Sequence, residues 1–202
     1  MNDPDAELML TFCRGREDAF VELYRRYRDR IVAFCRRIVG TDAQAEEAAQ
    51  DVFIKLYRAR EGYAPRSRFS TFLYRIAANH CLNLQARVEH KVVQRGVEVD
   101  ARPLPGQADR APAPHAALEQ GELRDQLARA LATLPDRQRA ALVLVHYEGL
   151  SYEEAAEAID VTESALKSLI HRARAAMMHE LAPFMQGAAG AGRGSKGARH
   201  AM

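Results

Sequence analysis

Apolar residues recur every three or four positions along most of the chain, which is the spacing of one face of an α-helix. In the first half, this spacing predicts a short helix that opens at Asp3 and three longer helices, over 18–39, 42–60 and 70–93. Gly40 stands where the first of the longer helices must stop, and the Gly, Pro and Ser residues of 62–68 indicate a loop. These elements predict an all-α domain over 5–95.

The helical pattern is lost over 96–114 and returns beyond it. Four prolines fall in this stretch, together with Gly, Ala and Asp, which predicts a flexible linker, extended or disordered. After it, an amphipathic helix is followed by a helix over 135–147 whose apolar residues lie nearly all round, so that it should be buried. The Gly- and Ala-rich tail over 184–202 is predicted to be disordered. We therefore expect two small helical domains, 5–95 and 115–183.

Residues 147–181 have the outline of a helix-turn-helix. Ser151 and Glu154 form a capping box that opens a short helix, and Asp160 occupies a turn position that requires left-handed backbone. Thr162 is a good N-cap for a second helix. The apolar residues of this second helix share one face: Leu166, Ile170, Ala173 and Met177.

The opposite arc of the second helix is polar and basic, with a width that fits the major groove of DNA. Together with the cap, it gives the predicted DNA-reading residues: Thr162, Ser164, Lys167, Ser168, His171, Arg172 and Arg174. Six acids and no Lys or Arg fall in 148–163, whereas 164–178 holds three basic residues and no acid. Because carboxylates oppose the release of counterions from phosphates, this division favours a second helix that faces DNA. A surface hairpin with solvated charges is the alternative.

A second candidate surface lies in the predicted loop and the start of the helix after it. Arginines there alternate with aromatic residues: Tyr63, Arg66, Arg68, Phe69, Phe72, Tyr74 and Arg75. This combination suits single-stranded DNA, because cations follow the backbone and rings stack on unpaired bases. The alternative is that Phe69 and Phe72 are core residues and that the arginines only solvate the surface. Composition does not decide between the two.

The composition is that of a globular protein of 202 residues with a net charge of +2, so any surface for nucleic acid must be local. There is no run of 18 apolar residues, and the acidic N-terminus lacks a signal-peptide pattern, which argues against membrane insertion and indicates a cytoplasmic protein. Cys13, Cys35 and Cys81 are not spaced as metal ligands and are expected to be buried or half-buried thiols, with redox sensing by Cys13 as the alternative. No metal or other cofactor is expected.

Three segments, read in order, are DVFIKLY, FSTFLYRIAANHCLN and LATLPDRQRAALVLVHYEGLSYEEAAEAIDVTESALKSLIHRARAAM. Their combination resembles the extracytoplasmic-function (ECF) group of the sigma-70 family, the small bacterial sigma factors that have only regions 2 and 4. The resemblance covers about residues 5–183. Three positions depart from the usual family pattern: Phe72 stands in place of a Trp, Ala78 in place of an Arg, and Leu169 in place of an Arg. The last of these leaves the base preference of the second helix open.

The resemblance implies a role for each domain. The first domain would bind the β′ clamp helices of core RNA polymerase through four residues: Gln50, Asp51, Phe53 and Lys55. The loop from Tyr63 and the helix after it would read and melt the minus-10 element, with Asn79 lining the pocket of an unstacked base. The second domain would read the minus-35 element with its arc, and 134–147 would meet the β flap. An anti-sigma factor is implied as a further partner.

Two other classes of protein serve as alternatives. A stand-alone helix-turn-helix regulator would need a dimer interface or a receiver domain, and the sequence has neither a heptad seam nor alternating strands and helices. An enzyme would need a nucleophile elbow, a Gly-rich phosphate loop or a carboxylate pair on strands, and none of these patterns is found. The predicted function is therefore that of a non-catalytic sigma factor that directs promoter recognition, DNA melting and transcription initiation.

Overall fold

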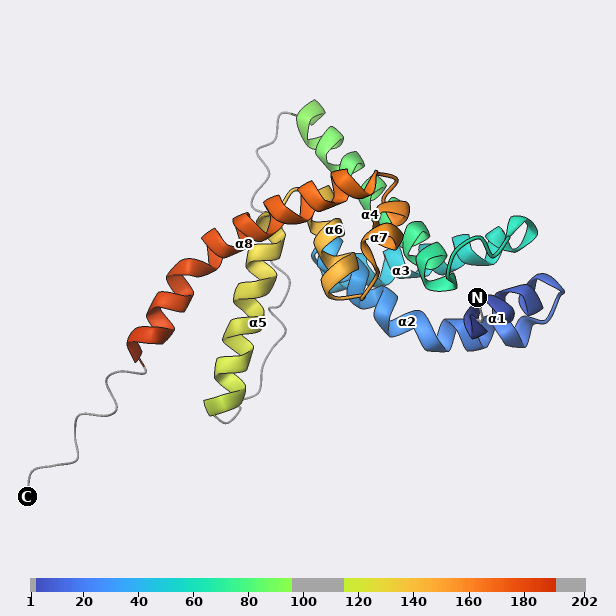
Figure 1. Ribbon diagram of the computed structural model, residues 1–202, viewed down its shortest axis with the longest axis horizontal. Helices are drawn as coiled ribbons and strands as arrows, with labels where there is room; N and C mark the ends of the chain where they lie inside the picture. Colours follow the sequence, from blue (N-terminus) through green and yellow to red (C-terminus); the bar gives the residue numbers. More distant parts are fainter. Residues whose placement is uncertain (1–2, 96–114, 192–202) are drawn as a thin grey trace, which may run out of the picture.

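The computed structural model describes residues 3–95 and 115–191, and every regular element within these ranges is a helix (Figure 1). The first domain contains α1 (Pro4–Cys13), α2 (Glu17–Val39), α3 (Asp42–Arg58), the 3₁₀ turn η1 (Ala59–Gly62) and α4 (Phe69–Arg95). The second domain contains α5 (His115–Thr133), α6 (Asp136–His146), α7 (Tyr152–Ala158) and α8 (Glu163–Ala191). The all-α, two-domain prediction is confirmed, and the predicted linker over 96–114 lies outside the described residues.

The helix ends follow the capping residues that the sequence predicts. Asp3 accepts hydrogen bonds from two backbone N–H groups in the first turn of α1. Ser151 and Glu154 form both hydrogen bonds of the capping box at the start of α7. Asp160 has a φ of 53° in the turn, and Thr162 caps α8 by accepting from a backbone N–H at 3.2 Å. The helix-turn-helix is therefore built as the sequence indicates.

The helix α8 extends eight residues beyond the predicted end of the second domain. Residues 184–191 were expected to belong to a disordered tail, yet α8 continues through them to Ala191. The Gly- and Ala-rich composition was the basis of that prediction. Alanine has the highest helix propensity, however, and extending an existing helix avoids the cost of nucleating a new one. Residues 192–202 lie outside the described part of the chain.

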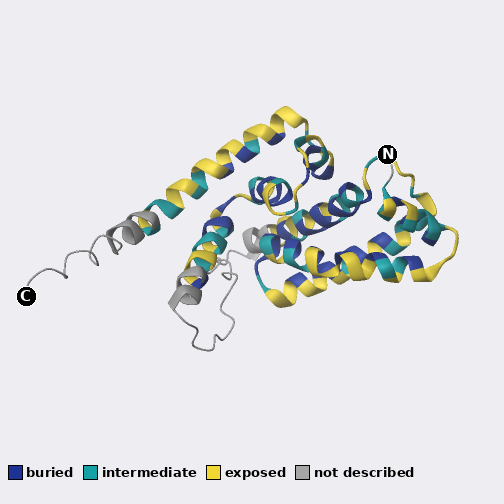
Figure 2. Cartoon of the chain, turned by 60° about the horizontal axis from the view of Figure 1, so that its bottom comes forward, coloured by how far each residue is buried: buried dark blue, intermediate teal, exposed yellow. Residues whose placement is uncertain are grey.

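The long helix α2 is the centre of the first domain. It packs against α1, α3 and α4, and Figure 2 shows buried positions recurring along the helices where they face one another. The fully buried residues of α2 are Leu23, Ile31, Phe34, Cys35 and Ile38. These are members of the stripe that the spacing of apolar residues predicts.

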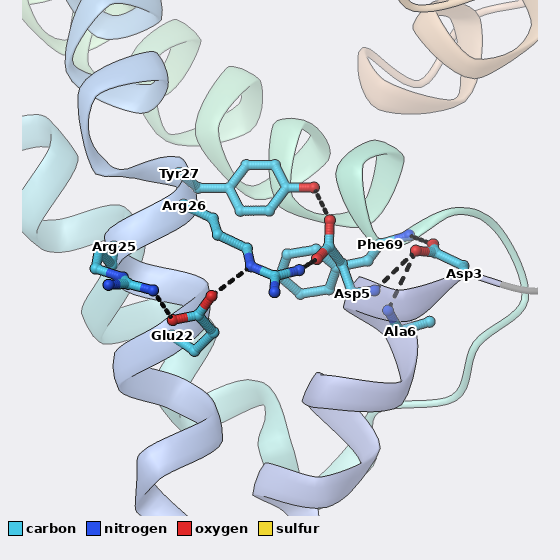
Figure 3. A network of polar contacts seen from close by, with 8 residues as sticks. All are labelled: Asp3, Asp5, Ala6, Glu22, Arg25, Arg26, Tyr27 and Phe69. Carbon is cyan, nitrogen blue, oxygen red and sulfur yellow. Dashed lines mark hydrogen bonds and ion pairs between the residues drawn. The ribbon is translucent and has the colours of Figure 1, made fainter.

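A polar network joins α1 to α2 and to the start of α4 (Figure 3). Besides capping α1, Asp3 accepts a hydrogen bond from the backbone N–H of Phe69 at 2.7 Å. Asp5 accepts from the hydroxyl of Tyr27 and from Nη1 of Arg26, both at 2.6 Å. The first backbone N–H groups of a helix have no hydrogen-bond acceptor within the helix. Asp3 supplies an acceptor for such groups at the start of both α1 and α4. This network fixes where α4 begins.

The second domain packs directly against the first, with α7 against α4, and α6 against both α2 and α4. Arg139 of α6 is 1% exposed and donates through Nη1 to the carbonyl oxygen of Ile38 in α2 at 2.7 Å. Its Nε and Nη2 donate to three carbonyl oxygens near the end of α5: those of Leu131, Ala132 and Leu134. One guanidinium thus satisfies the C-terminal carbonyls of two helices, one from each domain.

The double capping by Asp3 can be tested by substitution. Asp3→Ala removes the acceptor at both helix starts, so we expect the free energy of unfolding to fall by about 1–2 kcal/mol, measured by urea denaturation. Asp29→Ala is the matched control, because its side chain is 90% exposed and pairs with Arg28 on the surface. The control should change stability by less than about 0.5 kcal/mol. Equal losses for the two variants would contradict the capping role.

Candidate nucleic-acid interface

α8 presents the polar arc that the sequence predicts. Leu166, Ile170 and Ala173 are buried in the core, whereas Met177 is only half-buried. The predicted DNA-reading residues are all exposed: Thr162, Ser164, Lys167, Ser168, His171, Arg172 and Arg174. Leu169 lies on the flank, partly buried against the core. A helix with one buried stripe and one exposed polar arc has the form of a major-groove reader.

Local contacts hold the cations of this arc. Lys167 Nζ lies 2.6 Å from a carboxylate oxygen of Glu163, one turn earlier, and this hydrogen-bonded ion pair raises the pKa of Lys167. Arg172 Nε donates to the carbonyl oxygen of Ser168 at 3.3 Å. Exposed ion pairs of this kind are weak, so phosphates can displace them. Sequence reasoning did not single out Glu163 as a partner of the candidate arc, because it was counted as the last acid before the arc.

Arg174 reaches from α8 back to α6. Its Nη2 lies 2.8 Å from Nε2 of His146. Burial, and then the charge of Arg174, lower the pKa of His146, so the imidazole is neutral at pH 7 and accepts through Nε2. This contact places Arg174 at the edge of the arc and not at its centre.

The loop before α4 and the first turns of α4 gather aromatic and basic side chains. The rings of Tyr63 and Phe72 lie 5.0 Å apart in an edge-to-face arrangement, and both are half-buried. Arg75 lies over the Phe72 ring, with Cζ 5.4 Å from its centroid. The exposed polar residues of this region are Arg66, Arg68 and Asn79. Partly exposed aromatic rings beside arginines are typical of surfaces that bind single-stranded DNA, because the rings can stack on bases and the arginines can pair with phosphates.

Two of the predicted aromatic residues are closed to DNA in this structure. Phe69 is fully buried, with its ring 5.3 Å from that of Tyr27. Tyr74 is also fully buried, beside Phe34, and its hydroxyl donates to Glu148 of the second domain. For Phe69, the alternative of a core residue is therefore correct, because α4 begins with this side chain turned into the core of the first domain. We remove Phe69 from the candidate DNA contacts.

An apolar groove of about 370 Å³ lies between α2 and α3. It is lined by Phe20, Tyr24, Gln50, Phe53, Ile54, Tyr57 and Arg58. Gln50 and Phe53 were predicted to bind core polymerase and belong to this lining, whereas Asp51 and Lys55 do not. Ile54, which is 47% exposed, was missed. The available signal was that Ile54 is the strongly apolar residue of DVFIKLY that lies off the buried stripe of α3.

Asp51 lies beside α4 instead. Nε2 of the buried His80 lies 3.3 Å from Oδ2 of Asp51. Burial, and then the charge of Lys55, lower the pKa of His80, so its imidazole is neutral near pH 7. The predicted polymerase-binding residues therefore fall into two neighbouring groups, one in the groove and one around His80.

The cysteines have the buried or half-buried positions that the sequence predicts. Cys35 and Cys81 are buried, with their sulfur atoms 3.6 Å apart, and Cys13 is partly buried. The hydrogen bond with Cys81, and then burial, raise the pKa of Cys35. The described residues contain no group of three or more His, Cys, Asp or Glu arranged to hold a metal ion. None of the helices within 3–95 and 115–191 combines the length and apolar composition that crossing a membrane requires.

An exposed, cationic second helix in a helix-turn-helix, together with a basic and aromatic loop in another helical domain, defines a two-domain DNA-binding protein. Comparison with known families identifies both domains: residues 23–89 match Sigma-70 region 2, and residues 124–177 match Sigma-70, region 4. The chain belongs to the sigma-70 family and, within it, to the ECF sigma factors.

The similarity extends over most of the chain. It is 33% identical to the RNA polymerase sigma-H factor of Pseudomonas aeruginosa over 91% of this chain and 97% of that protein. It is 30% identical to the ECF RNA polymerase sigma factor SigW of Bacillus subtilis over 83% of this chain and 91% of that protein. Among solved structures, the sigma factor RpoE in complex with the anti-sigma factor NepR from Bartonella quintana matches with a TM-score of 0.65 and 21% identity, over 80% of this chain and 96% of that chain. The structural match shows the same fold.

The two histidines with lowered pKa values make stability depend on pH. His80 and His146 are neutral in the folded chain near pH 7 and regain ordinary pKa values near 6.5 on unfolding. Below about pH 6.5, the unfolded state binds more protons than the folded state, so the free energy of unfolding falls as the pH falls. We expect a lower urea midpoint at pH 5.5 than at pH 7.5.

His80→Gln should reduce the difference in urea midpoint between pH 5.5 and pH 7.5. The control, substitution of the exposed His171 by Gln, should leave that difference unchanged. The same pH dependence in the wild type and in both variants would remove His80 as a source of the effect.

Proposed function

We propose that this protein is an ECF sigma factor that binds core RNA polymerase and directs promoter recognition, DNA melting and transcription initiation. The observation that carries the proposal is the presence of sigma-70 regions 2 and 4 in one chain, with the arc of α8 exposed. In this role the chain has no catalytic activity of its own, because the polymerase carries out the chemistry, and it acts in the cytoplasm.

In the proposed mechanism, α8 enters the major groove at the minus-35 element. Lys167 and His171 are four residues apart and lie on one line of the arc, so both reach base edges. Arg172 and Arg174 lie beside that line and contact phosphates. The hydroxyl groups of Thr162, Ser164 and Ser168 are further candidate DNA contacts on the same surface. Base-edge contacts give sequence preference, and phosphate contacts give position and salt-dependent affinity.

The loop before α4, and α4 itself, engage the minus-10 element in this mechanism. Arg66, Arg68 and Arg75 follow the strand backbone, and the rings of Tyr63 and Phe72 provide stacking surfaces for unpaired bases. Asn79 is exposed on the same helix, where its amide can hydrogen-bond an unstacked base. Tyr74 becomes available only when the second domain moves away from α4.

The groove between α2 and α3 is the proposed docking surface for the β′ clamp helices. Phe53 and Ile54 give it an apolar floor and Gln50 adds a polar group, while Asp51 and Lys55 lie outside the groove near His80. The β flap was predicted to meet 134–147, and α6 within this segment packs against both α2 and α4 of the first domain in this structure. Binding of the flap therefore requires a change in domain arrangement. By analogy with the NepR complex of the Bartonella relative, an anti-sigma factor is a proposed further partner.

Transcription with purified core polymerase tests the proposed function. Adding this protein to core polymerase should give run-off transcripts from a subset of promoter fragments in a genomic library. A stand-alone regulator would instead shift duplex promoter DNA strongly without polymerase and would not support transcription. Absence of both core binding and promoter-specific transcripts would refute the sigma-factor role.

Substitutions in α8 should separate reading from positioning. Lys167→Ala should relax preference at one or two minus-35 positions, because a base-edge contact contributes about 1–3 kcal/mol of discrimination. Arg174→Ala should reduce activity evenly across promoters and lower the slope of the salt dependence by about 1. The measurement is a transcription panel of single-base minus-35 variants at two salt concentrations. Identical profiles for the two variants would show that this assignment of roles is wrong.

The groove can be tested with a matched pair of exposed apolar residues. Ile54→Ser should weaken binding to core polymerase by about tenfold, because it removes an apolar contact of about 1–2 kcal/mol from the interface. Val88→Ser is the control, since Val88 is 50% exposed on α4 and does not line the groove. Both variants should keep the wild-type unfolding midpoint. Equal core affinities, measured by fluorescence anisotropy, would exclude Ile54 from the interface.

A further inference from the structure

Acidic residues of α7 lie on the surface that we assign to the minus-10 element. Glu157 Oε1 accepts a hydrogen bond from the hydroxyl of Ser67 at 3.1 Å and lies 3.5 Å from Nη1 of Arg75. Glu154 Oε1 lies 3.8 Å from Nη1 of Arg68. Two of the arginines proposed to follow the DNA backbone therefore face carboxylates of the same chain.

A third acid, Glu148, is buried where the two domains meet. Its side chain is 4% exposed and lies 3.7 Å from Arg30, 3.6 Å from Arg37 and within hydrogen-bond distance of the Tyr74 hydroxyl. All three partners belong to the first domain. A buried carboxylate is costly unless it is paired, and here the first domain both buries Glu148 and supplies its partners.

The turn around Glu148 makes further contacts with the same part of the first domain. Arg30 donates to the backbone carbonyl of Glu148 at 3.3 Å, and Arg37 lies over the ring of Tyr147 at 4.4 Å. The turn between α6 and α7 thus fills a site formed by α2 and α4. It carries with it the acidic side of α7, which covers the loop and the first turns of α4.

We infer that the second domain of the free chain occupies the minus-10 surface, with its carboxylates in the place of DNA phosphates. This inference rests on the proposed minus-10 role of α4. Single-stranded DNA and α7 then compete for the same arginines, and Tyr74 is withheld from bases until the domains separate. The contact is intramolecular, so the acids are present at high effective concentration.

The charge pattern of the helix-turn-helix supports this inference. Six acids and no Lys or Arg fall in 148–163, and three of these acids are the ones that face the first domain. The arc of α8 remains exposed in the same arrangement. The contact therefore covers the proposed minus-10 surface and leaves the proposed minus-35 surface open.

The test compares full-length variants that lose the same charge. Glu148→Ala combined with Glu157→Ala removes two acids that face the first domain. Glu153→Ala combined with Asp160→Asn removes two exposed acids of the same segment, neither of which pairs with the described residues of the first domain. Glu154 is left intact because it belongs to the capping box of α7.

The measurements are the radius of gyration by small-angle X-ray scattering and the Kd for a fluorescein-labelled single-stranded 20-mer of mixed sequence. The apparent Kd of a site is its intrinsic Kd divided by the open fraction, so opening a chain that is about 10% open lowers the Kd about tenfold. We expect the first double variant to expand and to bind about tenfold more tightly, and the control to match the wild type within about twofold.

A second pair of variants removes positive charge. Tighter DNA binding by such a variant cannot result from a more positive net charge. Arg37→Ala deletes a contact with Glu148 and Tyr147, whereas Arg36→Ala deletes a neighbouring exposed arginine that pairs with Asp42 within the first domain. Arg37→Ala should bind the 20-mer more tightly despite losing a cation, and Arg36→Ala should not. An unchanged radius of gyration in both opening variants, or expansion without tighter binding, overturns the inference. Failure of the proposed function is detected separately, as loss of transcription with core polymerase.

Discussion

The guanidinium of Arg139 sets how the two domains meet. It is nearly inaccessible to solvent, and a buried charge of this kind is tolerated only when its donors are used. Carbonyl oxygens at the end of α5 take three of its hydrogen bonds within the second domain, and the carbonyl oxygen of Ile38 takes another from the first. The C-terminal end of α2 must therefore lie against α6. Separation of the domains replaces one of these hydrogen bonds with water and leaves the others in place, so Arg139 stabilises the second domain in both arrangements.

The other contacts between the domains differ in strength. The side chain of Glu148 is 4% exposed and is enclosed by two arginines and a tyrosine, whereas the pairs of Glu154 and Glu157 with Arg68 and Arg75 are partly exposed. Exposed pairs contribute about 0–1 kcal/mol each, so the buried turn holds the interface and the α7 acids mainly decide which surface is covered. An interface of this kind is specific without being permanent, which suits a protein whose proposed partners need both domains apart.

Most of the fold could be predicted from local patterns. The bounds of α2, the cap at Asp3, the capping box at Ser151 and the left-handed Asp160 all depend on residues within a few positions of one another. Phe69 shows where such reasoning stops: it and Phe72 belong to the same helical turn, and their burial depends on where α4 meets α1 and α2. The end of α8 was misjudged because the Gly- and Ala-rich composition outweighed helix propensity. The contacts of Glu148 with α2 and α4 join residues more than 70 positions apart, and no local pattern specifies them.

The acids of the helix-turn-helix show how one sequence feature supports two arguments. The absence of acids from 164–178 favours DNA binding by this part of α8, because a carboxylate among phosphates opposes binding. Their concentration in 148–163 has a separate effect, because it gives α7 and its preceding turn a surface complementary to the arginines of α2 and α4. Lys167 pairs only one turn away with Glu163, so its availability does not depend on the other domain. Arg75 pairs with Glu157 of the second domain, so the availability of Arg75 depends on where that domain lies. It follows that domain separation should change access to the proposed minus-10 surface while leaving the proposed minus-35 surface as it is.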